Sequence, residues 1–182
     1  IRQKFKELYL PESLIELKDG WCYSTPNLTK IEISPLNKNF TYFDGKFLLG
    51  KSDQKSGNFN VLLFARRDIE EAVIPSNIKI ISPFAFHRCK RLKSIEIPED
   101  SKLQTLCEES FDGSGIVEIY FPSSVKTIGK FSFFDCKNLR YIEFSEDSQI
   151  EIIDEFSFSQ TDIKEIHIPP NVSKICKNAF RY

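Results

Sequence analysis

The sequence predicts a solenoid repeat, with short parallel β-strands on one face and irregular or short helical arms on the other. The main observation is a period of 47 residues, which places Pro75, Pro122 and Pro169 at equivalent positions. A strand-like segment also recurs seven times, and in the regular part of the chain a phenylalanine follows it at a similar interval. A fixed period indicates that each unit buries its apolar residues against its neighbours. We therefore expect a single domain of about seven coils over residues 1–182.

The strand-like segments have apolar residues at their first, fourth and sixth positions. Apolar alternation with many β-branched residues is typical of a short strand with one buried face. A proline follows five of the segments directly and would end the strand there. The segments are 5–10, 28–33, 69–74, 92–97, 116–121, 139–144 and 163–168.

The second arm of each coil is marked by a pair of apolar residues three apart, such as Ile78 and Ile81. A phenylalanine preceded by a small residue comes next, and Cys22 takes its place in the first coil. A small residue lets adjacent coils approach, so we expect the rings to stack in the core. An aromatic stripe that binds a ligand is the alternative. The phenylalanines are Phe86, Phe111, Phe133, Phe158 and Phe180.

The period is interrupted once, between the segments centred on Ile31 and Ala72. Three strand-like runs and the turn signal Asp44-Gly45 predict an inserted β-hairpin or small antiparallel sheet over residues 36–66. The insertion is expected either to pack against the side of the solenoid or to form a recognition loop. Because the last coil ends soon after Phe180 without a recognisable cap, we expect the chain to be part of a longer protein.

Composition argues against several function classes. The net charge is −1, and basic residues are not expected to gather into a groove, so nucleic-acid binding has little support. No apolar run is long enough to span a membrane as a helix. The five cysteines lie two or three coils apart on their ladders, too far for disulfides, so we expect free thiols. We expect no cofactor, no metal site and no enzymatic activity, because catalytic and metal-binding motifs are missing.

The run from Ile74 to Ile97 resembles the repeat of the BspA-type leucine-rich repeat family, IP-x-x-V-x-x-I-x-x-x-A-F-x-x-C-x-x-L-x-x-I-x-I. The resemblance covers residues 5–34 and 69–180. It implies a leucine-rich-repeat solenoid of the kind found in surface proteins of anaerobic bacteria and protozoan parasites. It further implies a cell-surface or secreted adhesion protein that binds host or extracellular-matrix proteins.

One surface of the expected solenoid has a pattern of its own. The third and fifth residues of each strand point outward, and many of them are glutamate or tyrosine. Tyrosine is a favoured interface residue, and carboxylates would attract a basic partner. The candidate ligand-binding residues are Glu71, Glu96, Glu118, Tyr120, Tyr141, Glu143, Glu165 and His167.

Two other interpretations of this face remain open. It could be a solvated sheet whose glutamates are neutralised by neighbouring cations, namely Lys6, Lys93, Arg140 and Lys164. Calcium binding by the glutamates is possible in principle, although no calcium-loop motif is present.

We therefore expect a non-enzymatic module that binds a protein ligand on its acidic, tyrosine-containing sheet face. The first alternative is an intracellular interaction scaffold, which unpaired cysteines favour. The second is an enzyme with a site beside the inserted hairpin. Nucleic-acid binding and membrane insertion of this segment are not expected.

Overall fold

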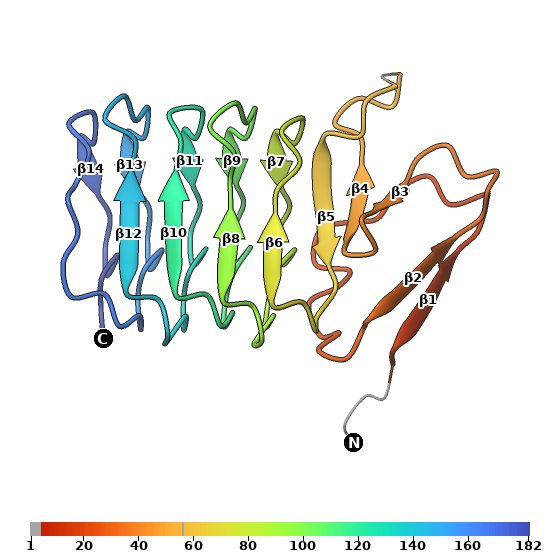
Figure 1. Ribbon diagram of the computed structural model, residues 1–182, viewed down its shortest axis with the longest axis horizontal. Coiled ribbons are helices and arrows are strands. Elements are labelled where there is room, and N and C mark those ends of the chain that lie inside the picture. The colour runs from red at the N-terminus through yellow and green to blue at the C-terminus, as the bar shows by residue number, and fades with distance from the viewer. Residues whose placement is uncertain (1–4, 56) are drawn as a thin grey trace.

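A computed structural model describes residues 5–55 and 57–182, which form a β-solenoid of about seven coils. The coils of the regular part stand side by side, with one parallel sheet toward the viewer and a second behind it (Figure 1). The front sheet consists of β6 (Glu71–Val73), β8 (Ser94–Glu96), β10 (Glu118–Phe121) and β12 (Tyr141–Phe144). The solenoid expected from the sequence is thus confirmed.

The expectation of irregular or helical arms is wrong, because the second arm of each coil is a short parallel strand. The described residues contain no helix. Each arm strand is only two residues long, too short for a helical turn, and its backbone bonds to neighbouring coils instead. The arms are β7 (Ile80–Ile81), β9 (Thr105–Leu106), β11 (Thr127–Ile128), β13 (Ile152–Ile153) and β14 (Lys174–Ile175).

The inserted segment extends this back sheet. β3 (Thr41–Phe43) and β4 (Phe47–Gly50) form an antiparallel hairpin around Asp44 and Gly45, both of which have positive φ. β5 (Val61–Ala65) pairs antiparallel with β4 on one side and parallel with β7 on the other. The strand β5 therefore joins the hairpin to the solenoid.

Strands β4 and β5 separate two cores. Phe47 and Leu49 face the core of the regular stack, whereas Leu48 between them faces a smaller N-terminal core. In β5, Leu62 belongs to the stack core and Phe64 to the N-terminal core. A strand covered on both faces is expected to be apolar throughout, which explains the buried sequence Phe-Leu-Leu-Gly of β4.

The first two strands do not continue the front sheet. β1 (Glu7–Leu10) and β2 (Lys30–Ile33) form a separate parallel pair, set at an angle to the regular coils (Figure 1). The predicted strand at 163–168 lies beside β12 but has no strand assignment. Ile168, at the end of this segment, is exposed. The front sheet therefore has four hydrogen-bonded strands.

The phenylalanine column expected from the repeat is confirmed. Phe86, Phe111 and Phe133 stack with centroid distances of 4.6 and 5.0 Å and nearly parallel planes. Phe158 and Phe180 continue the column at 5.3 and 5.8 Å. The small residue before each ring is buried, as close approach of the coils requires.

Candidate ligand-binding face

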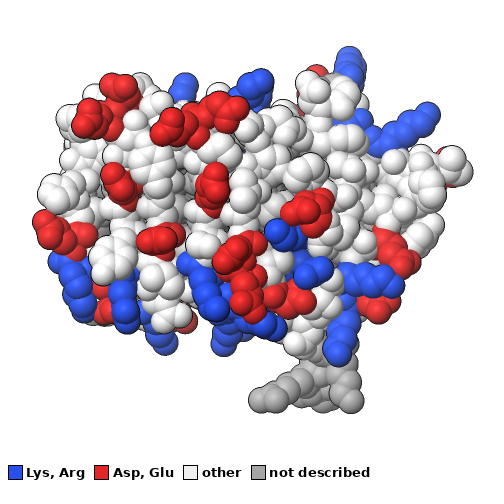
Figure 2. Space-filling view, viewed as in Figure 1, with Lys and Arg blue, Asp and Glu red and all other residues white. Residues whose placement is uncertain are grey.

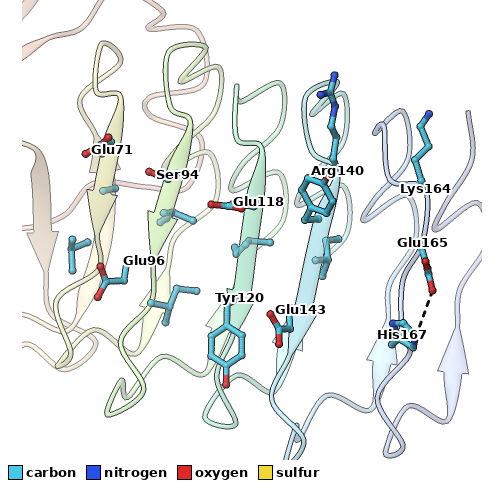
Figure 3. Close-up of a pocket in the computed structure, with 17 residues that line it drawn as sticks. Glu71, Ser94, Glu96, Glu118, Tyr120, Arg140, Glu143, Lys164, Glu165 and His167 are labelled. Carbon is cyan, nitrogen blue, oxygen red and sulfur yellow. Dashed lines mark ion pairs between the residues drawn. The ribbon is translucent and has the colours of Figure 1, made fainter.

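A shallow groove of about 910 Å³ runs across the front sheet, perpendicular to its strands (Figure 3). All eight residues selected from the sequence border it, although they come from five different coils. Side chains in the sheet point alternately inward and outward, so the third and fifth positions of each segment reach the same surface. The structure thus brings the predicted residues together on one face.

The strand register arranges the carboxylates of this face in a staggered pattern. One row contains Glu71, Ser94, Glu118 and Tyr141, which are neighbours in the strand pairing. The row two residues further along pairs Val73 with Glu96, and Tyr120 with Glu143. Glutamates therefore stand on alternate strands in each row, and the two rows are offset by one strand (Figure 3). Because adjacent strands lie about 4.8 Å apart, the carboxylates of one row repeat at about 10 Å.

The side chains between the carboxylates are aromatic or apolar. Tyr141 is 66% exposed and Val73 52% exposed, and Tyr120 is half-buried. Aromatic residues such as tyrosine are enriched in protein interfaces. The face therefore offers hydrophobic contact area as well as negative charge.

Three of the four cations expected to neutralise the face, Lys93, Arg140 and Lys164, are paired elsewhere. Arg140 and Lys164 bind the two carboxylate oxygens of Asp162, at 3.0 and 2.6 Å. The hydrogen bond from Lys164, together with Arg140, lowers the pKa of Asp162. Lys93 pairs with Glu70 at the beginning of the neighbouring strand segment. Because these cations pair with Asp162 and Glu70, they do not form ion pairs with the glutamates of the face.

Within the described part of the chain, four carboxylates of the face have no ion-pair partner. They are Glu71, Glu96, Glu118 and Glu143, and all four are exposed. The fifth, Glu165, lies 3.7 Å from Nε2 of His167, and both side chains are largely exposed. The face has a net negative charge at neutral pH.

Among the groove residues that sequence reasoning did not select as ligand-binding are its two basic residues, Arg140 and Lys164. They stand directly before the outward-facing Tyr141 and Glu165, so their place beside the strands could be inferred from the sequence. Their position at one end of an otherwise acidic groove depends on the pairing with Asp162. Figure 3 shows both at the upper end of the groove.

The neighbourhood of Cys89 does not form a nucleophile and base pair. Its thiol faces Arg67 and the carbonyl oxygens of Ala65 and Arg66, and burial raises its pKa. His87 instead directs Nε2 toward Asp112, at 3.1 Å, and stacks against Tyr23. The two side chains that are close in sequence are therefore engaged in different contacts.

Three further observations limit the chemistry of the described residues. All five cysteines are unpaired, and three of them are buried. No group of three His, Cys, Asp or Glu side chains in the described part is placed to hold a metal ion. Likewise, none of the described segments is a helix long and apolar enough to cross a membrane.

A second groove contradicts the expectation that basic residues would not gather. It measures about 470 Å³ and is lined by Lys6, Arg67, Arg88, Lys90 and Arg91, among others. These residues come from three segments that the sequence places far apart. They meet where the pair β1–β2 diverges from the front sheet.

The fold and the repeat pattern define a leucine-rich-repeat solenoid. The BspA type leucine rich repeat region, in six copies, matches residues 58–182, and the chain belongs to this family. No curated protein matches the sequence.

Two solved structures show the likeness of the fold. One is a leucine-rich repeat protein from Eubacterium ventriosum, with 23% identity over 97% of this chain and a TM-score of 0.70. The other is the pneumococcal vaccine antigen PcpA, with 17% identity over 79% of this chain and a TM-score of 0.60. The chain spans 58% and 47% of their respective lengths.

Proposed function

We propose that this chain is a non-enzymatic recognition module whose front sheet binds a cationic segment of a protein ligand. The observation that carries the proposal is the set of exposed carboxylates that have no ion-pair partner among the described residues, such as Glu96, Glu118 and Glu143. Opposite charge on a partner would speed association and select against acidic proteins. Tyr120 and Tyr141 would add apolar contact at the centre of the groove.

The spacing of the carboxylates favours a particular kind of ligand segment. Each row repeats at about 10 Å across the strands. A polyproline-type segment rises about 3.1 Å per residue, so a basic residue at every third position would repeat at about 9.3 Å. A β-strand presents side chains on one side about 6.8 Å apart, which does not match. The preferred ligand is thus an extended, proline-containing cationic segment that lies across the strands.

The proposal is tested with a labelled (Lys-Pro-Pro)5 peptide, whose binding is followed by fluorescence anisotropy at several salt concentrations. Reversing charge in E96K/E118K/E143K should weaken binding at least about tenfold, because attraction becomes repulsion. The matched control is E108K/E146K/E151K, which makes the same change in net charge at exposed glutamates away from the groove. It should bind nearly as tightly as the unmodified chain.

Equal weakening in the two triple variants would reject the front face as the site. A block peptide of identical composition, with all lysines adjacent, tests the spacing argument separately. If it binds as tightly as the alternating peptide, the face attracts positive charge without regard to spacing.

We further propose display at the cell surface or secretion, with a host or extracellular-matrix protein as the ligand. The support is the family and the likeness in fold to a pneumococcal vaccine antigen. The alternative, an intracellular scaffold, is favoured by the five unpaired cysteines. Labelling intact source cells with a membrane-impermeant amine reagent separates the two, since only a displayed protein would be labelled.

A further inference from the structure

The basic groove lies between the pair β1–β2 and the front sheet, and Figure 2 shows lysine and arginine, interspersed with acidic residues, along the lower part of the molecule. Five of its lining residues are basic, namely Lys6, Arg67, Arg88, Lys90 and Arg91, and Asp68 is the acidic one. Its volume of about 470 Å³ is within the range of small-ligand sites. The groove is separate from the face proposed to bind protein.

Much of the positive charge in this groove is not balanced by nearby carboxylates. Asp68 binds Arg66, outside the groove, at 2.6 Å. Arg91 pairs with Glu70. Among the described residues, Lys6, Arg88 and Lys90 have no ion-pair partner.

Arg67 forms the inner wall of the groove. It is only 4% exposed, and its guanidinium donates hydrogen bonds to the carbonyl oxygens of Ala85, Cys22 and Phe84. These acceptors are neutral, so they hold the guanidinium in place without cancelling its charge. A fixed buried charge raises the potential of the space beside it more than a mobile surface lysine does.

The repeat itself does not require these cations. One period later, the positions of Arg88, Lys90 and Arg91 are held by Asp135, Lys137 and Asn138. There, Lys137 pairs with Asp135 at 3.0 Å, so the equivalent turn carries no net charge. The same backbone thus folds with a neutral turn, and the basic residues are a property of this site.

The space for a ligand comes from the break in the solenoid. In the regular stack adjacent turns are in contact, and a Cβ on Gly115 would lie 2.2 Å from the carbonyl oxygen of Lys90. Strand β2 of the N-terminal pair and strand β6 of the front sheet are not hydrogen-bonded to each other, which leaves the groove open. The basic residues therefore line an open groove, unlike the closely packed turns of the regular stack.

We propose that the basic groove binds a sulfated or phosphorylated saccharide. Arginine presents planar N–H donors that match the oxygens of a sulfate or phosphate group. Thr29 and Asp68, which also line the groove, can hydrogen-bond to sugar hydroxyls. Single-stranded nucleic acid is disfavoured, because the described lining residues include no aromatic side chain on which a base could stack.

The test is calorimetric titration of the whole chain with a heparin-derived tetrasaccharide and with mannose 6-phosphate. The variant R88Q/K90Q removes two exposed charges that pair with no described carboxylate, so folding should be unaffected. We expect at least about a tenfold loss of affinity for whichever saccharide binds, since charge-assisted contacts are lost. The matched control K102Q/K126Q removes the same charge at exposed lysines elsewhere on the surface and should leave the affinity within about twofold, because distant exposed charges are screened.

Several results would overturn the proposal. The first is a failure of both saccharides to bind the unmodified chain at physiological salt. The second is equal weakening in the two double variants, which would indicate general charge attraction. A third is binding of a desulfated tetrasaccharide, or of a thymidine oligonucleotide of matched charge, as tight as that of the sulfated tetrasaccharide. Binding should survive in E96K/E118K/E143K, which separates this site from the front face.

Discussion

The regular stack and the N-terminal region are held together in different ways. In the stack, the same contacts recur in each coil, with one ring of the phenylalanine column and one pair of sheet strands per unit. The N-terminal region relies on single contacts, such as the packing of Trp21 against Phe64 and the hydrogen bonds of Asn37 to Pro11 and Leu14. A repeated contact distributes stability over many units, whereas a single contact concentrates it. The regions should therefore respond differently to substitution.

The largest effect is expected from Phe111→Ala in the centre of the stack. Phe111 is fully buried between Phe86 and Phe133, so the change would open a cavity and remove two ring contacts. We expect a loss of about 3–5 kcal/mol in the free energy of unfolding, measured by urea denaturation. The exposed hairpin residue Phe43 provides the control, and Phe43→Ala should cost less than about 1 kcal/mol. Similar losses in the two variants would contradict a stack centred on the column.

The second prediction concerns the boundary between the regions. Arg67→Met keeps the side-chain length but removes the hydrogen bonds of the guanidinium to the carbonyls of Ala85, Cys22 and Phe84. We expect a loss of about 2–4 kcal/mol, because three hydrogen bonds from a charged donor that connect the two regions would be lost. Trp21, the only tryptophan, reports on the N-terminal region, and its fluorescence should change at lower urea than the far-ultraviolet circular dichroism.

The neighbouring Arg66 supplies the control for that experiment. Its guanidinium binds Asp68 near the surface, so Arg66→Met should cost less than about 1 kcal/mol. If Arg66→Met costs as much as Arg67→Met, the buried arginine is not what joins the two regions.

The smallest effect is a gain in stability within the stack. The hydroxyl of Ser132 is buried and has no hydrogen-bond partner among the described residues, whereas Ala85 and Ala179 occupy the same repeat position. Ser132→Ala should therefore raise the free energy of unfolding by up to about 1 kcal/mol. By contrast, the hydroxyl of the buried Ser148 accepts a hydrogen bond from the backbone of Ile150, so Ser148→Ala should be destabilising. A loss in both variants would show that the hydroxyl of Ser132 is satisfied.

The sequence was most informative where the repeat is regular. The period placed Phe86, Phe111 and Phe133 on one column, because identical spacing in a solenoid implies identical position. It was less informative about the arms, since a pair such as Ile78 and Ile81 suits a short strand as well as a helical turn. The division of β4 between two cores was also hidden, because its three apolar residues do not reveal which neighbour covers each face.

The two candidate sites also differ in how far the sequence alone predicts them. The front face could be predicted, because outward positions follow from strand alternation and need only local register. The basic groove could not, because Lys6, Arg67 and Arg88 approach one another only through the break between β2 and β6. A surface made by the repeat is visible in the sequence, while a surface made by its interruption depends on tertiary structure.

The central claim is that the front sheet of the regular stack is the protein-binding surface. The most direct measurement is a backbone amide chemical-shift titration with the (Lys-Pro-Pro)5 peptide at physiological salt. We predict saturable shifts concentrated at Glu96, Glu118, Tyr120 and Glu143 in β8, β10 and β12. Shifts confined to the back strands β9, β11 and β13 or to β1–β2, or the lack of saturable shifts, would contradict the account.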